Sequence, residues 1–504
     1  MTTLAIDTHL LGWLQLLPVL GALWLLIVQR TWLAWPIALT TGIGELLLSL
    51  RLYQRFDLTT TDWQWHARLP LSNWLVQSSA ADGITVLFVL LTAFLCLLVL
   101  LYGGLVRRFH HLPRFFAVVL ACEATLVGQF ASLDLLWYTL MAALQTGLVG
   151  YLLTNWSLTA DERLANQRYY QFMGTSLLLI LAATLMLGWH HAELTHGQWS
   201  FELTTLVQDT RSPYLQSVIF YLLFYGLAIR VPLFPLHGWL PHVMEHGTVA
   251  AAMVLLLGLK TGIHGMLRFI FPLFPDAVWR WHEFVIAIAA FGILYSALLA
   301  LVQKNLRKLL AYAVVSHTGI LVIGLFSLHP QSFQGGIMLT GSFGLAITTL
   351  MLMAGIVHQR TRSLAFERLG GLLSPLPWVG IAFLVAAFSV VGMPGTPGFD
   401  AVHLLLEAAI ERFGALVTVL AALGNVVAAA CLLWAFQRAF LATPTANAPP
   451  RASITRATPI EKGLAALLIA VQLASGFNAD PWLALVKNSA QTLAAPFVHL
   501  GERP

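Results

Sequence analysis

The succession of long apolar segments is the feature that most constrains what this chain can fold into. A run of about 18 or more mostly apolar residues is long enough to cross the hydrocarbon core of a bilayer as an α-helix. Only 10% of the residues are charged, against roughly 25% in a soluble protein. We therefore predict an all-α polytopic membrane protein with about 14 transmembrane helices. The runs lie near residues 9–28, 35–50, 83–103, 115–133, 135–154, 171–188, 214–234, 248–270, 282–302, 309–328, 335–357, 376–412, 414–441 and 460–477.

Two of the predicted helices, the seventh and the twelfth, are interrupted. The run 376–412 is too long for one straight span and contains the sequence GMPGTPGF, whose Gly and Pro residues break a helix. Residues 232–247 hold several prolines at the end of the seventh run. Broken backbone leaves polar groups unpaired, and a membrane protein tolerates this only where the break is buried in protein or lines a polar cavity. Both breaks are therefore candidate functional positions.

The rest of the composition excludes several classes of function. The net charge is +5, but no basic patch or single-sign tail is present, so nucleic acid is not an expected partner. The three cysteines stand apart in apolar runs, without the spacing of a metal site. No phosphate-binding loop, nucleophile elbow or zinc-protease motif occurs. We therefore expect no metal, no cofactor and no covalent chemistry in this chain alone.

The distribution of Lys and Arg predicts the orientation in the bilayer. Loops that follow odd-numbered runs hold about 16 cations, and those that follow even-numbered runs hold about 7. The positive-inside rule then places the odd loops in the cytoplasm and both termini on the outer side. The first run lacks a basic leader and a cleavage site, so we expect it to be retained. The chain reads as one transmembrane domain, 1–504, with a polar linker at 442–459 before the last helix at 460–477.

Two cations lie inside apolar runs, Arg230 before the first break and Lys260 after it. A charged side chain at mid-bilayer costs about 2.5 to 3.5 kcal/mol on insertion scales. We therefore expect both to face protein or water rather than lipid, although Arg230 could instead snorkel or anchor a pair of helices. The segment between them holds three histidines that either line a cavity entrance or belong to an ordinary interface loop: His237, His242 and His246.

Carboxylates also occur within apolar runs. Past the second break, Asp400, His403, Glu407 and Glu411 recur at intervals of three or four residues and so share one face of a helix. Because His titrates near neutral pH, this face could load or release protons; a solvated helix end would account for Glu411 alone. Glu123 stands in the middle of FAVVLACEATLVGQF, where it is either a charge partner or a helix-packing residue.

The segments that hold these residues resemble a known family. The sequences ADGITVLFVLLTAFLCLLVL, AIRVPLFPLHGWLPHVMEHGTVAAAMVLLLGLKTGIHGMLRF, NLRKLLAYAVVSHTGILVIGL and GMPGTPGF look like those of the antiporter-like subunits of respiratory complex I and of Mrp antiporters. The resemblance implies two inverted five-helix repeats, near 113–270 and 282–441, with helices 7 and 12 broken. It also implies proton movement along a row of Lys, His and Glu at mid-membrane.

The residues of that row match this chain only in part. The family's lysines of helices 7 and 8 fall on Arg230 and Lys260, and the histidine of helix 10 falls on His317. An arginine stays charged and cannot be a simple relay, whereas a desolvated lysine can. The other polar positions of the family's row fall on apolar residues here: Ala143, Phe343 and Val402. We hypothesise that Glu123, or less directly Glu45, replaces the glutamate missing at Ala143 as the partner of Arg230.

Three functions are compatible with this pattern. The first is a proton-conducting subunit of an energy-coupled complex in the bacterial cytoplasmic (inner) membrane. Within this first function, the departures from the family's row of polar residues favour the membrane subunit of an inorganic-carbon pump, the DabB type. Such a subunit works beside a soluble or peripheral zinc-containing subunit. The second is an antiporter-like subunit, M-like or N-like, of an NADH–quinone oxidoreductase, a hydrogenase or an Mrp complex. The third is a structural anchor that conducts nothing.

Overall fold

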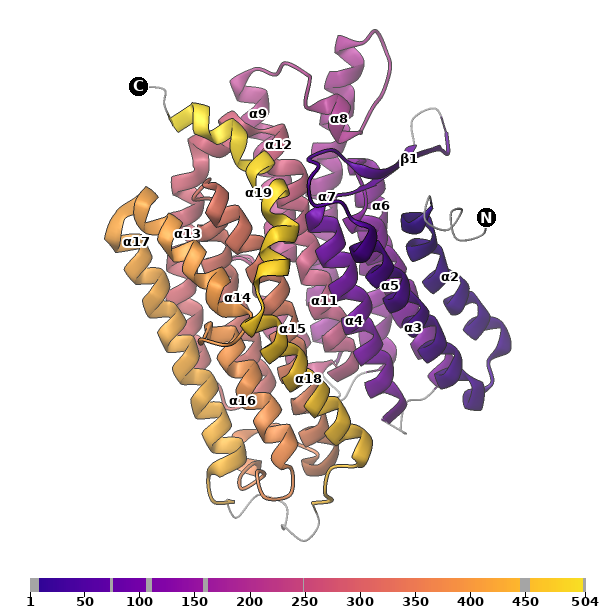
Figure 1. Ribbon diagram of the computed structural model, residues 1–504, viewed down its shortest axis with the longest axis vertical. Helices are drawn as coiled ribbons and strands as arrows, with labels where there is room; N and C mark the ends of the chain where they lie inside the picture. Colours follow the sequence, from indigo (N-terminus) through magenta and orange to yellow (C-terminus); the bar gives the residue numbers. More distant parts are fainter. Residues whose placement is uncertain are drawn as a thin grey trace. The chain divides into compact units, whose positions relative to one another are not determined.

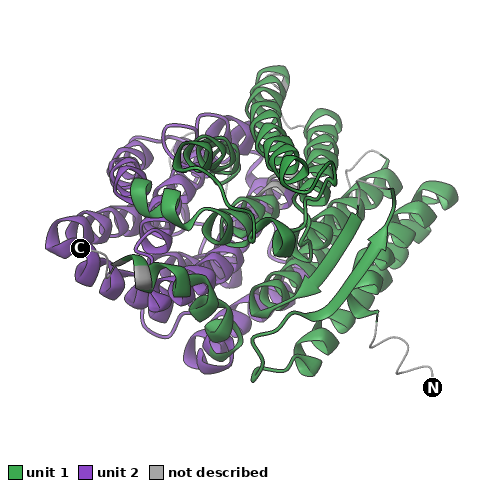
Figure 2. Cartoon of the chain, turned by 90° about the horizontal axis from the view of Figure 1, so that it is seen from above, with its two compact units in different colours: residues 1–231, 257–281, 484–504 green, residues 232–256, 282–483 purple. Residues whose placement is uncertain are grey.

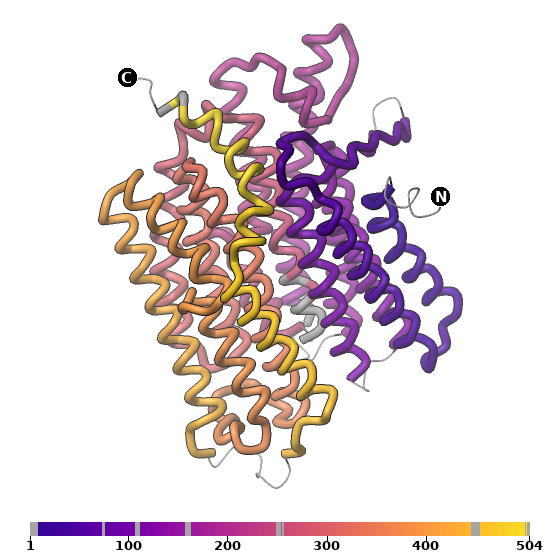
Figure 3. The backbone as a smooth tube through the Cα atoms, in the orientation of Figure 1, coloured from indigo at the N-terminus to yellow at the C-terminus, as the bar shows by residue number. Residues whose placement is uncertain are grey.

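The computed structural model describes residues 9–72, 76–105, 111–156, 162–247, 249–444 and 454–501, and Figure 3 traces the backbone. Helices dominate this part of the chain (Figure 1). Eleven of the helices among the described residues are long and apolar enough to cross a membrane. Every predicted apolar run overlaps at least one of the helices. The prediction of an all-α polytopic membrane protein is confirmed.

The chain forms two compact units, each assembled from separate stretches of sequence (Figure 2). Unit 1 comprises residues 1–231, 257–281 and 484–504, and unit 2 comprises 232–256 and 282–483. The prediction of one domain with two inverted repeats stays a prediction, because a division by compactness does not test it.

Unit 1 is built on a bundle of apolar helices. The elements that lie in it wholly or in large part are α2 (Leu10–Val28), α3 (Thr31–Arg55), α4 (Gly83–Leu105), α5 (Leu112–Phe130), α6 (Leu135–Asn155), α7 (Glu162–Leu194), α8 (Leu203–Leu206), α9 (Pro213–Arg230), α11 (Val249–Gly265), the π-helical η1 (Met266–Ile270), α12 (Phe271–Leu273) and α19 (Asp480–Gly501). A hairpin of β1 (Gln64–Pro70) and β2 (Val76–Ala81), which sequence reasoning did not predict, pairs antiparallel before α4.

Unit 2 holds the later helices. They are α10 (Leu240–His246), α13 (Pro275–Leu301), α14 (Leu306–Leu325), α15 (Pro330–Thr361), the 3₁₀ turn η2 (Phe366–Arg368), α16 (Pro377–Val391), α17 (Gly398–Phe436), the π-helical η3 (Gln437–Leu441) and α18 (Pro459–Phe477). Helices α14 and α15 are almost entirely buried, whereas α17 and α18 expose much of their apolar surface. Exposed apolar side chains along a membrane-spanning helix are suited to contact lipid.

Both predicted helix breaks are present. Helix α9 ends at Arg230, and irregular backbone leads to the short α10. Helix α16 ends at Val391, and α17 begins at Gly398, where a Cβ atom would lie 2.4 Å from the carbonyl oxygen of Ser389. That approach requires glycine and explains why the break is glycine-rich. Gly414, with φ of 72°, kinks α17 into two halves, as expected from the two adjacent apolar runs.

The predicted linker at 442–459 falls partly on residues 445–453, which lie outside the described residues. Its described end leads into α18 through a capping box. The Thr458 side chain accepts from the Glu461 backbone N–H, and Glu461 accepts from that of Thr458. Glu461 is also ion-paired with Arg360 at 2.5 Å. These contacts fix the start of the last predicted membrane helix.

Candidate functional site

Arg230 is held inside unit 1 without a carboxylate. Its side chain is 4% exposed. Its Nε donates to Ser176 Oγ at 3.1 Å, and its Nη2 donates to Thr146 Oγ1 at 3.2 Å and to the Ala142 carbonyl at 3.3 Å. Hydroxyl and carbonyl oxygens of α6 and α7 thus solvate a permanent positive charge. The prediction that Arg230 faces protein rather than lipid is confirmed.

The hypothesis that Glu123 pairs with Arg230 is wrong for this structure. Glu123 is 1% exposed, and neither of its carboxyl oxygens has a hydrogen-bond partner among the described residues. It lies beside the Cys96 thiol of α4 and within electrostatic range of Glu45 on α3. Its mid-span position in the sequence correctly predicted the depth of Glu123 in the bundle. The side chain, however, projects toward α3 and α4 instead of toward Arg230. Two carboxyl groups, Glu45 and Glu123, are therefore buried near each other, and neither forms an ion pair with a described residue.

Lys260 is the second buried cation of unit 1. It is 4% exposed, and its Nζ has no hydrogen-bond partner among the described residues. Helix α11 packs tightly at this level: the Tyr138 hydroxyl donates to the Thr261 carbonyl at 2.6 Å, and a Cβ on Gly258 would lie 2.6 Å from Gln145 Nε2. A desolvated ammonium can release its proton, whereas a guanidinium cannot. Chemically, Lys260 can therefore relay protons and Arg230 can only supply fixed charge.

In unit 2, His317 occupies the middle of α14. It is 3% exposed, its Nε2 lacks a hydrogen-bond partner among the described residues, and its ring stacks on Phe343 with centroids 4.0 Å apart. Phe343 stands where the family pattern predicts a histidine, so an aromatic ring fills a place expected to be polar. Val402, another such position, is buried at 7% exposure. By contrast, Ala143 of unit 1 is exposed on α6.

The three histidines around the first break have different surroundings. His237 is 8% exposed and contacts the rings of Phe234, Tyr295 and Tyr312. His242 and His246 are half-buried on α10. Their part in a cavity entrance stays a prediction, because the cavity described below is lined by other residues.

The polar face past the second break points out of the chain. His403, Glu407 and Glu411 are exposed, and Asp400 is half-buried. None of these four side chains makes a hydrogen bond or an ion pair with the described residues; the His403 ring stacks on Phe399, with centroids 6.4 Å apart. An uncompensated charge facing lipid costs about 2.5 to 3.5 kcal/mol near the middle of a helix. This face therefore differs from the buried charges of unit 1.

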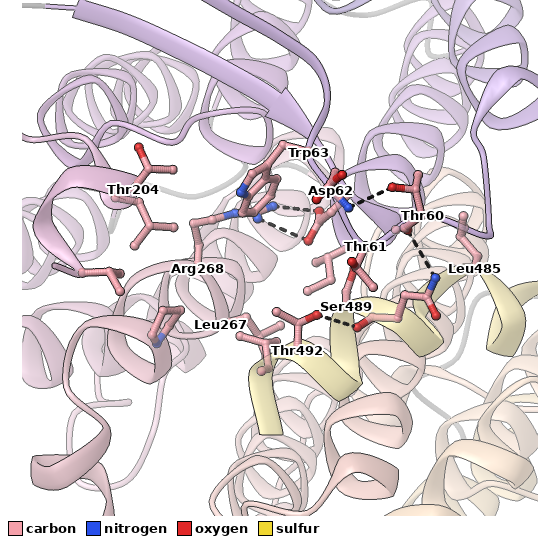
Figure 4. Close-up of a pocket in the computed structure, with 18 of the residues that line it drawn as sticks. Thr60, Thr61, Asp62, Trp63, Thr204, Leu267, Arg268, Leu485, Ser489 and Thr492 are labelled. Atoms are coloured by element: carbon pink, nitrogen blue, oxygen red, sulfur yellow. Dashed lines mark hydrogen bonds and ion pairs between the residues drawn. The ribbon is translucent and has the colours of Figure 1, made fainter. Parts of the chain in front are cut away.

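The ion pair of Arg268 with Asp82 was not predicted from the sequence. Arg268 of η1 donates through Nη2 to Asp82 Oδ1 at 2.8 Å and to Thr85 Oγ1 at 2.8 Å, and its guanidinium lies 4.6 Å from the ring centre of Trp63. Burial acts to raise the pKa of Asp82, but the Arg268 charge and the hydrogen bonds from Arg268 and Thr85 hold that pKa below its ordinary value. The pair borders a cavity of about 420 Å³ formed by loop, α8 and α19 residues of unit 1 (Figure 4).

No group of three or more His, Cys, Asp or Glu residues within the described ranges is placed to hold a metal ion. The buried polar residues of the described membrane-spanning segments are instead Arg and Lys cations, carboxyls, amides, hydroxyls and imidazoles. A helical bundle with two broken helices and buried charges at mid-span is typical of ion-transporting membrane proteins.

Comparison with known proteins specifies the class. The chain matches the family described as NADH:quinone oxidoreductase/Mrp antiporter, TM, over residues 132–428, and it belongs to this family. It is 30% identical over 439 residues to NADH-ubiquinone oxidoreductase chain 4 of Marchantia polymorpha, covering 85% of this chain and 86% of that protein. It is also 30% identical over 448 residues to NADH-quinone oxidoreductase subunit M of Rhodobacter capsulatus, covering 87% and 86% of the two chains.

Solved structures agree with the sequence relatives. A chain of respiratory complex I from Thermus thermophilus with bound NADH superposes with a TM-score of 0.86 at 26% identity, covering 96% of this chain and 99% of that one. A chain of the Mrp complex from Dietzia sp. DQ12-45-1b gives a TM-score of 0.85 at 18% identity, with 98% and 99% covered, which shows a shared fold. The resemblance to complex I and Mrp subunits expected from the sequence is confirmed, and the protein is a multi-pass membrane protein of the antiporter-like type.

Proposed function

We propose that this chain is the M-like, proton-pumping subunit of a multi-subunit oxidoreductase. The observation that carries the proposal is its similarity, over more than four-fifths of its length, to chain 4 and subunit M of NADH–quinone oxidoreductases. This was the alternative prediction from the sequence. The inorganic-carbon pump and its zinc-containing partner find no support in these relatives, and we do not propose them.

In this proposal, Lys260 is the relay and Arg230 is a fixed positive charge in the same unit. A proton on Lys260 is disfavoured by dry surroundings and by any positive charge nearby. Arg230 contributes a charge that never changes during a cycle, because a guanidinium keeps its proton. His317 continues the route in the second repeat, at the position where the family carries a histidine of its proton row. Glu123 and Glu45 form a separate buried carboxyl pair, from which protons could be supplied.

The proposal is tested by Lys260→Ala in the intact complex, reconstituted in proteoliposomes with a pH-sensitive dye inside. We expect proton movement to fall by at least about tenfold, the effect of removing a positioned acid–base group. Lys462→Ala is the matched control, because Lys462 is an exposed lysine at the start of α18. Normal proton movement with Lys260→Ala in a fully assembled complex would leave the chain as a structural anchor.

We further propose that the chain lies in a bacterial inner membrane with its odd loops in the cytoplasm. The cation asymmetry of the loops supports this orientation. The three native cysteines are buried, so an introduced cysteine can be labelled with little background. In right-side-out vesicles, an impermeant thiol reagent should label Gln198→Cys but should reach Thr443→Cys only after the membrane is permeabilised. Labelling of Thr443→Cys in sealed vesicles would reverse the orientation.

A further inference from the structure

One helix face of unit 2 carries unpaired charges outward. We call the side chains of Asp400, His403, Glu407 and Glu411 on α17 the acidic face. Its spacing of three or four residues places the four groups in one stripe. His403, Glu407 and Glu411 are exposed, and none of the four side chains makes a hydrogen bond or an ion pair with another described residue. The exposed apolar side chains Phe399 and Ile410, which are 40% and 50% exposed, flank them.

The depth of the acidic face follows from the helix break. Helix α16 approaches the break with 15 residues, and the first half of α17, residues 398–413, leaves it with a similar length. At 1.5 Å per residue each half is long enough to cross about half of a bilayer, so the break lies near mid-membrane. His403 then lies about 8 Å from the break and Glu407 about 14 Å from it, against a half-thickness of about 15 Å for the hydrocarbon core.

Contact with lipid is energetically unfavourable for the acidic face. The second half of α17 shows what a lipid-facing surface of the same helix looks like, because Leu416, Val419 and Val426 are 74%, 59% and 63% exposed and entirely apolar. Charged side chains inside a membrane are normally turned to a protein interior or to water and are paired. The acidic face has neither arrangement among the described residues, which points to a partner outside the chain.

We propose that the acidic face is the docking surface for a transmembrane helix of a companion subunit, and that this helix presents basic side chains at the levels of His403 and Glu407. Charge complementarity selects such a helix, because three of the four groups are carboxylates. The mid-span cations Arg230 and Lys260 of a second copy of this chain would not reach this face, since both are buried in unit 1. The proposal goes beyond the proposed function, because it holds whether or not the chain conducts protons.

Photo-cross-linking tests the proposal with all four polar groups intact. The variants are Phe399→p-benzoylphenylalanine and Ile410→p-benzoylphenylalanine, made in the native complex in its own membrane, with Val419→p-benzoylphenylalanine and Val426→p-benzoylphenylalanine as lipid-facing controls. We expect the first two to be linked to a transmembrane peptide that carries Lys or Arg at mid-span, and the controls to be linked to lipid. The proposal fails if Phe399 and Ile410 yield only lipid adducts, a second copy of this chain, a soluble protein or a helix without a basic residue.

Charge reversal gives an independent readout. Glu407→Lys should lower recovery of the cross-linked subunit in the purified complex by about tenfold or more, whereas Glu411→Lys, at the helix end, should lower it less because water screens that position. Replacing the cross-linked basic residue of the companion by Glu should restore recovery for Glu407→Lys. Unchanged recovery, or the absence of rescue while the isolated variant chain melts normally, would overturn the charge pairing.

Discussion

The charged side chains at the two helix breaks face in opposite directions. At the first break, Arg230 turns inward and is solvated by two hydroxyls and a carbonyl of its own chain. At the second break, His403 and Glu407 turn outward and have no partner among the described residues. A similar interruption of a membrane helix therefore accompanies a charge that is solvated by its own chain in unit 1 and a charge without such partners in unit 2. The comparison teaches that a polar residue beside a helix break is not by itself evidence of an internal pathway.

The difference has an energetic consequence for the isolated chain. Removing a ligand from a buried charge leaves that charge uncompensated, which is costly in a dry interior. Removing an exposed charge that has no hydrogen-bond or ion-pair partner breaks no stabilising contact within the chain. Substitutions should therefore destabilise unit 1 far more than the acidic face of unit 2.

The largest effect is expected for the buried ion pair of unit 1. Asp82→Asn leaves Arg268 without its carboxylate and should lower the free energy of unfolding by about 3 to 5 kcal/mol. Because the folded-state pKa of Asp82 lies below its ordinary value, the stabilisation is present above the unfolded-state pKa and is lost as pH falls through the folded one. Asp82→Asn should remove that acid dependence. Thermal melts in detergent across pH measure both effects, with the exposed Asp62→Asn as the control; equal melting of the two variants would contradict the prediction.

A smaller loss is expected around Arg230. Ser176→Ala deletes the hydroxyl that accepts from Arg230 Nε and donates to the Gly226 carbonyl at 2.7 Å. A hydrogen bond to a charged group contributes about 1.5 to 3 kcal/mol, so the melting temperature should fall accordingly. Thr175→Ala, one residue away and exposed, serves as the control and should change little. If both variants melt alike, Arg230 is not solvated as described and the contrast between the two helix breaks weakens.

The smallest effect is expected on the acidic face. Glu407→Leu in the isolated chain should change the free energy of unfolding by no more than about 0.5 kcal/mol, as for surface substitutions that break no contact. The same thermal melts measure it, and Val419→Ala provides a lipid-facing reference. A loss comparable to that of Ser176→Ala would mean that Glu407 already has a partner within the chain, and the comparison of the two breaks would no longer hold.

The sequence predicted the helices well because span length and hydropathy set membrane insertion directly. It also predicted that Arg230 and Lys260 face away from lipid, since a charge at mid-span is disfavoured there. It failed for the Glu123–Arg230 pair because position along a helix fixes depth but not direction around the bundle.

The acidic face shows the same limit in another form. The spacing from Asp400 to Glu411 predicted one shared face, yet periodicity does not say whether that face turns inward or outward. The hydroxyls that solvate Arg230 were also missed, although Thr146 and Ser176 stand within apolar runs, where a search for mid-span Ser and Thr would have found them. The hairpin of β1 and β2 gave no signal because its residues do not alternate cleanly between apolar and polar.

The return of α19 to unit 1 bears on the order of assembly during synthesis. Asn488 Nδ2 donates to the Leu58 carbonyl at 2.7 Å, across 430 residues of sequence, and Gly83 lies so close to Leu485 that a Cβ would meet its carbonyl oxygen. A ribosome needs on the order of tens of seconds to make the intervening chain. Most of unit 2, the continuous stretch 282–483, is translated before these contacts can form. Unit 1 is thus the first unit to begin synthesis and the last to be completed. The surface of unit 1 that α19 covers stays without this helix until residues 484–501 have been made.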